Sequence, residues 1–331
     1  MANNFWQNKT VLITGYEGFL GSHIAKKLLN RNAKVVGFDK VRNQSLSLSG
    51  DLRDNIIWVK GDIANLASVK QAIEKYKPEI VFHLAAETIV GTALKKPIAA
   101  FKSNIEGTWN ILEVCRGKKI VKAIIVASSD KAYGNHDVLP YKEDCGLKGD
   151  APYDVSKSCA DLLSYAYFRT YCLPVCTTRC GNIYGPGDPH FSRIVPDAIY
   201  SAIRDKKLLI RSDGKFIRDY IYVEDAVDGY ILLAEKMQKL RLFGESFNLS
   251  NDKPISVLEL VKKIYCIAGK KPDYRILDKA ENEIRRQYLS SKKARSLLGW
   301  RPRYTLEKGL EVTLEWYKGY FKIHHNRQNK D

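Results

Sequence analysis

No apolar run in this sequence approaches the roughly 18 residues that a membrane-spanning helix needs. Residues 1–9 lack the apolar core of a secretory signal peptide. The seven cysteines are scattered, without the paired spacing of a zinc site or a redox motif. We therefore expect a cytoplasmic protein with reduced thiols, no membrane contact and no bound metal.

Acidic residues are in the minority, because 37 Asp and Glu stand against 54 Lys and Arg, which gives a net charge of +17. Such a charge raises the question of nucleic-acid binding. The basic residues, however, form separated doublets such as Lys26-Lys27 and Lys292-Lys293 rather than one block. A basic surface that attracts small polyanions is the simpler interpretation, so we expect no nucleic-acid partner.

Apolar strands and helical patterns alternate over the first half of the chain. Strands are predicted at 9–14, 33–39, 56–59, 80–84, 123–127 and 175–179, and helices at 22–30, 67–76 and 97–115. Buried strands that alternate with helices predict the α/β class and a doubly wound parallel (Rossmann) sheet. Glycine and proline are denser in the second half, where we expect a smaller mixed α/β domain.

The predicted domains are 1–180, which forms the Rossmann unit, and 181–331, which mainly forms the smaller one. We expect the chain to return to the first domain around 216–245. A turn-rich stretch at 180–189 is typical of a loop that reaches over a site. The last helix is predicted over 306–317, followed by a polar, frayed tail.

A glycine-rich turn between the first strand and the first helix fits a dinucleotide. Gly15 and Gly18 let the backbone approach a pyrophosphate, and Gly21 lets helix and strand pack closely. Phe19 and Leu20 lie where the turn runs into a helix whose N-terminus faces the negative charge, and we include both in the cofactor site.

An acidic residue, Asp39, ends the second strand about 20 residues after this turn. A carboxylate there accepts hydrogen bonds from the adenosine ribose hydroxyls and repels a 2′-phosphate, which favours NAD over NADP. Lys40, which we count with the cofactor site, and Arg42 follow directly, and these cations leave the reverse preference open.

A phenol and an ammonium lie four residues apart at Tyr153 and Lys157, in a segment that reads as helix. Residues at this spacing share a helix face. The ammonium favours the phenolate, so the hydroxyl, with an ordinary pKa of about 10, becomes a candidate base closer to neutral pH. The alternative for such a pair taken alone is an exposed lysine beside a packed tyrosine.

Several motifs occur in one characteristic order. They are the glycine turn, Asp62-Ile63, Leu84-Ala85-Ala86, residues 104–108 (Asn-Ile-Glu-Gly-Thr), Ser128-Ser129, and Tyr153 with Lys157. With these motifs the chain resembles the extended short-chain dehydrogenase/reductases. In the second half, Arg179 and residues 181–187, 218–225 and 298–300 are similar to the nucleotide-sugar epimerase/dehydratase branch. The resemblance implies a bound NAD that is regenerated in each turnover, and a nucleoside-diphosphate sugar as substrate.

The resemblance also implies roles for single residues. Tyr153 would take the proton of the sugar 4-hydroxyl while hydride leaves C4, Lys157 would hold the nicotinamide ribose, and Ser129 would hydrogen-bond the same sugar oxygen. Further cofactor contacts would come from Asp62 and Ile63 at the adenine, from Leu84, Ala85 and Ala86 beside the dinucleotide, and from Asn104 near the nicotinamide.

The substrate diphosphate needs charge-assisted donors. The resemblance points to Asn182 and Arg218, with Arg193 as a further candidate. The alternative to diphosphate binding by Arg218 is that its guanidinium forms an ion pair with Asp219 or Glu224.

The reaction is decided next to Ser129. Oxidation at C4 makes the C5 hydrogen acidic, and a dehydratase must remove this proton and protonate the departing 6-hydroxyl. Asp130 is the candidate acid and Lys131 the candidate base, which requires a lysine pKa depressed by burial or by a neighbouring cation. The alternative is a turn in which Lys131 simply pairs with Asp130.

The nucleotide is left open by these motifs. Asp130-Lys131 is similar to the CDP-glucose 4,6-dehydratase group, whereas Glu87 and Thr88, which we expect beside the substrate, are similar to the TDP-glucose type. Residues 185–187 (Gly-Pro-Gly) are common in epimerases.

We therefore predict an NAD-dependent nucleotide-sugar 4,6-dehydratase, with CDP-glucose as a candidate substrate. An NDP-sugar 4-epimerase, a UDP-uronic acid decarboxylase and a non-catalytic NAD-binding regulator are the alternatives. The resemblance further implies a homodimer formed through the helices near 97–115 and 152–171.

Overall fold

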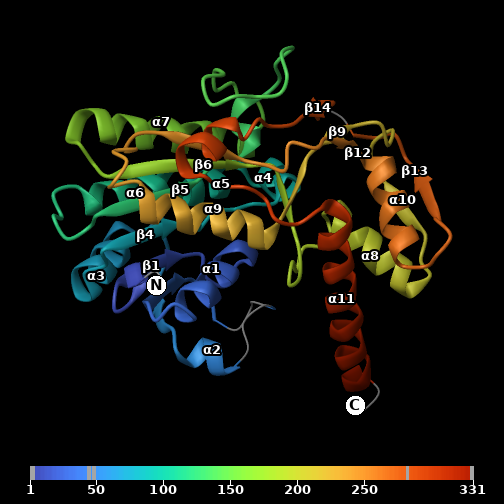
Figure 1. Ribbon diagram of the computed structural model, residues 1–331, viewed down its shortest axis with the longest axis horizontal. Helices are drawn as coiled ribbons and strands as arrows, with labels where there is room; N and C mark the ends of the chain where they lie inside the picture. The colour runs from blue at the N-terminus through green and yellow to red at the C-terminus, as the bar shows by residue number, and fades with distance from the viewer. Residues whose placement is uncertain (1–3, 43–45, 47–49, 281–282, 329–331) are drawn as a thin grey trace.

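A seven-stranded sheet with helices on both faces forms the larger part of the molecule, and a smaller group of strands and helices lies beside it (Figure 1). The computed structural model describes residues 4–42, 46, 50–280 and 283–328. The strands of the large sheet are β1 (Thr10–Thr14), β2 (Lys34–Asp39), β3 (Ile57–Lys60), β4 (Ile80–His83), β5 (Ala123–Ala127), β6 (Val175–Cys180) and β11 (Ser246–Leu249).

All neighbouring strands of this sheet run parallel, in the order β11-β6-β5-β4-β1-β2-β3. The strand order reverses between β1 and β4, which is where open α/β sheets bind ligands, at the carboxyl ends of the strands. The predicted doubly wound parallel sheet is confirmed. β11 lies just beyond the expected return segment 216–245, and the division into two domains stays a prediction.

Alternating side chains of β1 build two separate cores. Val11 and Ile13 pack into one core with α1 (Phe19–Leu29) and α9 (Val223–Lys236), and Leu12 packs into the other with α3 (Leu66–Tyr76) and α6 (Gly107–Cys115). Both faces of the sheet are therefore covered, which explains the nearly continuous apolar strand sequences.

The predicted helix 97–115 is interrupted by a π-helical turn. It consists of α5 (Pro97–Phe101), the turn η2 (Lys102–Glu106) and α6. The helix α4 (Val90–Lys95) precedes it, and α7 (Pro152–Tyr171) packs alongside. Short π-helical turns often mark functional positions, and this one carries Asn104.

The smaller part is a mixed α/β arrangement, as predicted. It pairs β7 (Asn182–Tyr184) with β10 (Tyr220–Tyr222), β8 (Leu208–Ile210) with β13 (Tyr274–Ile276), and β9 (Ile217–Arg218) with both β12 (Ile255–Ser256) and β14 (Arg286–Gln287). Its helices are α8 (Ile194–Arg204), α10 (Val257–Ile267) and α11 (Leu306–Gln328). Shorter elements elsewhere are η1 (Asn4–Trp6), α2 (Gly50–Asp54), η3 (Asp130–Tyr133) and η4 (Ala294–Leu298).

The prediction of a frayed tail after residue 317 is wrong, because α11 continues to Gln328. Tyr317 and Phe321 stack with ring centroids 5.8 Å apart and contact Phe191, so aromatic packing anchors the first turn beyond residue 317. Among the described helices, none combines the length and apolarity needed to cross a membrane.

Candidate active site

The glycine turn forms a backbone cradle at the carboxyl end of β1. Gly15 has a φ of +73°, and a Cβ there would lie 2.8 Å from the backbone nitrogen of Ala85. A Cβ on Gly21 would overlap the carbonyl oxygen of Gly15. The turn therefore packs too tightly for side chains, and its surface is backbone.

The N-terminus of α1 follows directly, with Phe19 and Leu20 as its first residues. Gly18 is the N-cap, in extended conformation, without a side-chain hydrogen bond, and the first turn holds no acid. The first N–H groups of a helix lack intrahelical acceptors and carry the positive end of the helix dipole. The cradle therefore fits a pyrophosphate.

The carboxylate of Asp39 lies beside this turn. Its Oδ2 accepts a hydrogen bond from the backbone of Glu17 at 3.2 Å, and its Oδ1 accepts one from the backbone of Lys40 at 2.8 Å. Burial raises the pKa of Asp39. The Nζ of Lys40 lies 3.1 Å from Oδ2 of Asp62, so the side chain of Lys40 pairs with Asp62 while its backbone nitrogen contacts Asp39.

The end of β4 is tied to β1 through Thr14. Its Oγ1 accepts hydrogen bonds from the backbone nitrogens of Leu84 at 3.1 Å and Ala85 at 3.2 Å. Ile63, on the far side of the sheet, packs against the start of α6, because a Cβ on Gly107 would lie 2.6 Å from its Cγ2. Asp39, Leu84 and Ala85 thus lie around the glycine turn at the carboxyl edge of the sheet.

Asn104 is buried and holds two neighbouring segments together. Its Oδ1 accepts from the backbone nitrogen of Glu87 at 2.7 Å, and its Nδ2 donates to the carbonyl of Glu87 at 3.0 Å and to Oγ of Ser156 at 2.9 Å. Asn104 therefore fixes the loop that carries Glu87 and Thr88 against the first turns of α7.

Tyr153 and Lys157 lie on one face of α7, as their spacing indicates. The Nζ of Lys157 donates to the carbonyl of Ala127 at 2.8 Å and lies 5.8 Å from the centroid of the Tyr153 ring. Burial lowers the pKa of Lys157 to about 8. Burial raises the pKa of Tyr153 to about 12, against the effects of a hydrogen bond with Ser129 and of the charge on Arg193.

The expectation that Lys157 brings the pKa of Tyr153 towards neutrality is therefore wrong. Lys157 is not among the largest causes of the shift, and desolvation of the phenolate outweighs the neighbouring cation.

Ser129, Asp130 and Lys131 form the start of η3 at the carboxyl end of β5. The Oγ of Ser129 donates to Oδ1 of Asp130 at 2.9 Å and accepts from the backbone nitrogen of Lys131 at 3.2 Å. Oδ2 of Asp130 is buried without a hydrogen-bond partner in the described part of the chain. The alternative interpretation is that Lys131 simply pairs with Asp130. Among the described residues the two side chains form no hydrogen bond or ion pair, although each charge acts on the pKa of the other group.

The two charged side chains of this turn are shifted in opposite directions. Burial raises the pKa of Asp130. Burial lowers the pKa of Lys131, and the charge on Arg218 lowers it further. The charge of Asp154, which follows Tyr153 on α7, raises the pKa of Lys131. Both shifts favour the uncharged forms, a carboxylic acid and an amine.

Arg218 is buried at the end of β9. Its Nη1 donates to the carbonyls of Ile217 at 2.9 Å and Arg285 at 3.3 Å, and its Nη2 lies 3.8 Å from Oε2 of Glu283. The alternative ion pair with Asp219 or Glu224 is thus not the one the structure forms. The charge of Arg218 acts on both Asp130 and Lys131, so the residue lies close to η3.

Arg193 connects the loop after β4 to the turn-rich stretch. Its guanidinium donates to Oδ2 of Asp188 at 3.0 Å and to Oγ1 of Thr88 at 3.5 Å. Asn182 is exposed at the start of β7, and its amide donates to the carbonyl of Asp219 at 3.2 Å. Arg193 lies close enough to Tyr153 for its charge to act on the pKa of that residue. Asn182 instead hydrogen-bonds to Asp219, the residue that connects β9 to β10.

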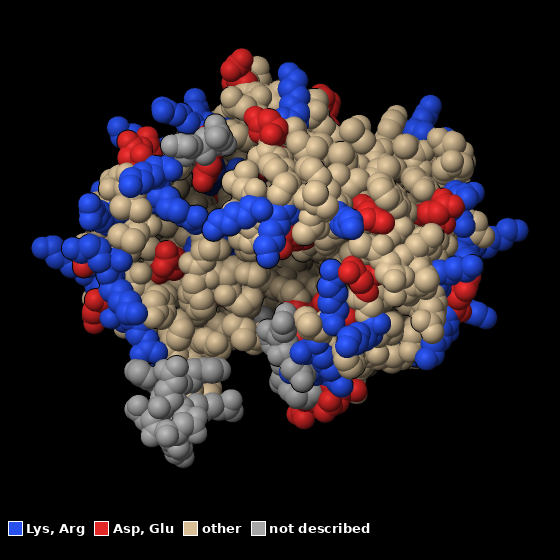
Figure 2. All heavy atoms as spheres, turned by 180° about the vertical axis from the view of Figure 1, so that it is seen from behind, with Lys and Arg blue, Asp and Glu red and all other residues tan. Residues whose placement is uncertain are grey.

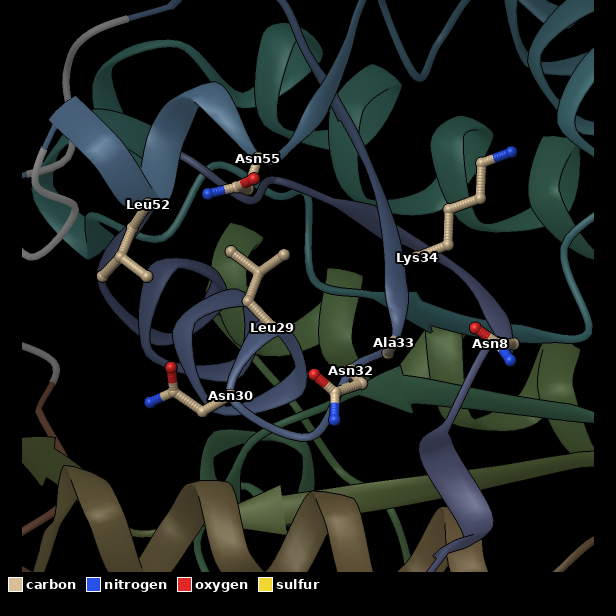
Figure 3. Close-up of a pocket in the computed structure, with 8 residues that line it drawn as sticks. All are labelled: Asn8, Leu29, Asn30, Asn32, Ala33, Lys34, Leu52 and Asn55. Atoms are coloured by element: carbon tan, nitrogen blue, oxygen red, sulfur yellow. The ribbon is translucent and has the colours of Figure 1, made fainter.

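A pocket of about 540 Å³ opens elsewhere, at the amino ends of β1 and β2 (Figure 3). It is lined by asparagines, including Asn8 and Asn32, and by Lys34, the first residue of β2. None of the predicted site residues lines it, so the candidate site is the edge at the carboxyl ends of the strands.

Two buried residues next to η3 were missed by the sequence interpretation. Asp219 is fully buried, and Gln287 donates from Nε2 to the carbonyl of Asp130 at 3.0 Å. Asp219 directly follows Arg218 in a motif already singled out, which is a usable signal. Gln287 has no such signal, because β14 reaches η3 only through the tertiary fold.

Comparison with known proteins places these features in a family. Residues 12–313 match the family model described as GDP-mannose 4,6 dehydratase. CDP-glucose 4,6-dehydratase of Salmonella typhimurium is 31% identical over 96% of this chain and 93% of its own length.

Solved structures of both dehydratases and epimerases have the same fold. A dTDP-glucose 4,6-dehydratase from Bacillus anthracis, in complex with NAD, is 28% identical, covers 94% of this chain and 97% of its own, and has a TM-score of 0.82. A UDP-glucose 4-epimerase from Thermotoga maritima, with UDP-glucose, is also 28% identical, covers 94% and 99%, and has a TM-score of 0.84. The resemblance drawn from the sequence is confirmed, and the chain belongs to the GDP-mannose 4,6 dehydratase family.

Proposed function

We propose that this protein is an NAD-dependent nucleoside-diphosphate-sugar 4,6-dehydratase. The observation that carries the proposal is the pair formed by the buried Asp130 and the half-buried Lys131, beside Ser129 and Tyr153. An elimination of water needs one group that gives a proton and one that takes a proton at the same place. Burial raises the pKa of the carboxyl group and lowers the pKa of the amine, so both shifts run towards the forms that this chemistry needs.

The residues around the glycine turn fit NAD. The backbone cradle and the uncapped N-terminus of α1 suit a pyrophosphate, and Asp39 beside them suits the ribose hydroxyls. When bound, NAD would accept a hydride from C4 of the sugar and later return it at C6. Asp39 would repel the 2′-phosphate of NADP, and the ammonium of Lys40 is already paired with Asp62.

Tyr153 is proposed to take the proton of the 4-hydroxyl, while Ser129 hydrogen-bonds the same oxygen. The phenolate that does so is disfavoured by burial, and the charge on Arg193 acts against this effect. Lys157 is held in place by the carbonyl of Ala127.

The elimination is assigned to η3. The amine of Lys131 takes the proton from C5, and the carboxylic acid of Asp130 protonates the hydroxyl that leaves C6 as water. Lys131 then returns its proton to C5 when C6 receives the hydride. The proton that Tyr153 removed from the 4-hydroxyl balances the one that Asp130 lost, and Ser129 lies between these two groups.

The substrate diphosphate is proposed to lie between Arg193 and Arg218, with Asn182, Glu87 and Thr88 at its margin. The site thus offers two guanidinium groups to one pyrophosphate. Because one relative acts on CDP-glucose and one structural neighbour on dTDP-glucose, CDP-glucose is the first substrate to test and the dTDP sugar the second.

The direct test is incubation with CDP-, GDP-, TDP- and UDP-hexoses and mass detection of the product. The proposal expects a 4-keto product lighter by one water from at least one of them. A product of unchanged mass with inverted C4 would show a 4-epimerase instead, and loss of carbon dioxide from a UDP-uronic acid would show a decarboxylase.

The protein is further proposed to work as a homodimer. Large apolar side chains are exposed on α5, α6 and α7, namely Ile98, Trp109, Leu162, Tyr165 and Tyr171. Exposed apolar surface of this kind is typical of an interface. The measurement is the mass in solution, expected near twice 37.6 kDa.

We propose a cytoplasmic location and no nucleic-acid or membrane partner. The seven cysteines are free thiols, which suits a reducing compartment. Lys and Arg are spread over the face shown in Figure 2 in several groups, interrupted by acidic residues, rather than as one continuous stripe.

A further inference from the structure

Three buried acceptor oxygens without hydrogen-bond partners occur where η3 meets β14 and the link between β9 and β10. Within the described residues they are Oδ2 of Asp130, Oδ1 of Asp219 and Oε1 of Gln287. These side chains are 4%, 0% and 0% exposed. Buried acceptors normally have donors, so three such atoms on connected residues call for a physical reason.

The three residues are joined through one short segment. Gln287 donates to the carbonyl of Asp130 at 3.0 Å, and the backbone nitrogen of Leu289, two residues later, donates to Oδ2 of Asp219 at 3.1 Å. Ser250 also donates to Oδ2 of Asp219. The other carboxylate oxygen of Asp219 packs against Gly181, where a Cβ would overlap it.

The charge of Asp130 acts on the carboxyl group of Asp219. Burial, and then the charge of Asp130, raise the pKa of Asp219 to about 7. The cations that act on Asp130 are Lys131 and Arg218. The other titratable groups around the two carboxyls are Tyr141, Tyr153, Asp154, Cys180 and Tyr220.

We propose that Asp219 is a positioning residue for the elimination, because its carboxyl group and that of Asp130 share a single proton at this buried junction. Two carboxylates that cannot both ionise hold one proton to a higher pH than either would alone. A proton on Asp219 supplies the donor that this junction lacks, and a proton on Asp130 is the one given to the departing hydroxyl. The inference rests on the proposed function for the role of Asp130.

The first test is the pH dependence of kcat in Asp219→Asn. The amide keeps the shape, accepts from Ser250 and Leu289, and donates where Oδ1 was, but it cannot become a negative charge. Asp130 then loses its proton at a lower pH. We expect the basic limb of the kcat profile to move down by about one pH unit, so that kcat on that limb falls about tenfold, with KM nearly unchanged.

Asp225→Asn is the matched control. Asp225 is also buried, and its carboxylate accepts from the backbone nitrogens of Arg303 at 2.8 Å and Tyr304 at 3.1 Å. It lies on α9, away from η3, so its pH profile should match that of the unaltered protein.

The second test does not depend on turnover. Below its folded pKa of about 7, Asp219 binds a proton that the unfolded chain releases near pH 4. The free energy of unfolding therefore falls as pH rises from about 4 to about 7, and Asp219→Asn should flatten this slope. Should that variant not fold, Ser250→Ala removes one donor to Asp219 and should move the basic limb of kcat upwards.

A wild-type pH profile together with an unchanged stability slope in Asp219→Asn would overturn the shared proton and leave the dehydratase proposal standing. Failure of every NDP-hexose to lose water would overturn the dehydratase proposal, while the stability slope would still decide whether the proton is shared.

Discussion

Lys131 is the residue on which the distinction between a dehydratase and its relatives depends most. It is half-buried, and desolvation and the charge of Arg218 lower its pKa, whereas Asp130 and Asp154 act to raise it. A lysine with a depressed pKa can take a proton from carbon, but a lysine held as a cation can only stabilise charge.

Lys131→Arg separates these two roles. A guanidinium places a permanent positive charge beside Asp130, because it does not deprotonate in proteins, so it cannot serve as a base. We expect kcat for water loss to fall by at least about a hundredfold, with little change in KM or in the melting temperature. Steady-state kinetics with mass detection measure this, and near-normal turnover would show that the cation alone suffices.

At the scale of elements, the glycine turn after β1 combines backbone strain with close packing. Gly15 and Gly117 have almost the same φ, +73° and +74°, but only Gly15 has neighbours where a Cβ would stand. Substituting each glycine in turn therefore separates two effects: the backbone strain of a side chain at positive φ, which both positions share, and the steric clash with the turn, which occurs only at Gly15.

Gly15→Ala should weaken NAD binding strongly, whereas Gly117→Ala should leave it unchanged. Both variants pay the conformational cost of a positive φ, about 1 kcal/mol. Only the first pushes against the Ala85 backbone at 2.8 Å and so displaces the surface that faces the pyrophosphate. Titration of NAD by calorimetry, with thermal unfolding in parallel, tests this, and equal affinity in the two variants would contradict it.

The π-helical turn η2 connects the loop after β4 with α7. Its Asn104 makes three hydrogen bonds, two to the backbone of Glu87 and one to Ser156, next to Lys157 on α7. Since the side chain is buried, its loss leaves those groups without partners.

Asn104→Ala should lower the free energy of unfolding by about 2 kcal/mol and raise KM for the nucleotide sugar more than it lowers kcat. The loop with Glu87 and Thr88 loses its anchor, while Tyr153 keeps its place on α7. Denaturant unfolding and substrate titration measure the two effects. Asn110→Ala is the control: Asn110 is also buried and hydrogen-bonded to backbone, at Ile63, so it should lose stability with KM unchanged.

The whole molecule carries a charge of +17, and the face shown in Figure 2 has several groups of basic side chains with acidic ones among them. A positive protein attracts a small polyanion from a distance, and dissolved salt screens this attraction over about 10 Å at 0.1 M.

Ionic strength should therefore act on capture of the substrate. We expect kcat/KM for the nucleotide sugar to fall severalfold between about 0.01 and 0.5 M sodium chloride, while kcat changes little. Initial-rate measurements over this range give both values. A kcat/KM independent of salt would show that the net charge has no part in binding.

The sequence alone determined the sheet, the glycine turn and the pairing of Tyr153 with Lys157. These features are local: strand periodicity, a strand–turn–helix succession and a spacing of four residues all act within one or two elements, so the order of residues specifies them. The order of motifs along the chain likewise indicated the family, because each motif begins or ends an element of one fold.

Tertiary structure decided what surrounds those residues. Asp219 and Gln287 reach η3 from segments far along the chain, and Arg193 meets Thr88 across 105 positions. Desolvation reversed the expected direction of the Tyr153 pKa, and aromatic packing extended α11 beyond its predicted end. Burial and long-range contact depend on the packing of the entire chain, and so no local pattern of residues encodes them.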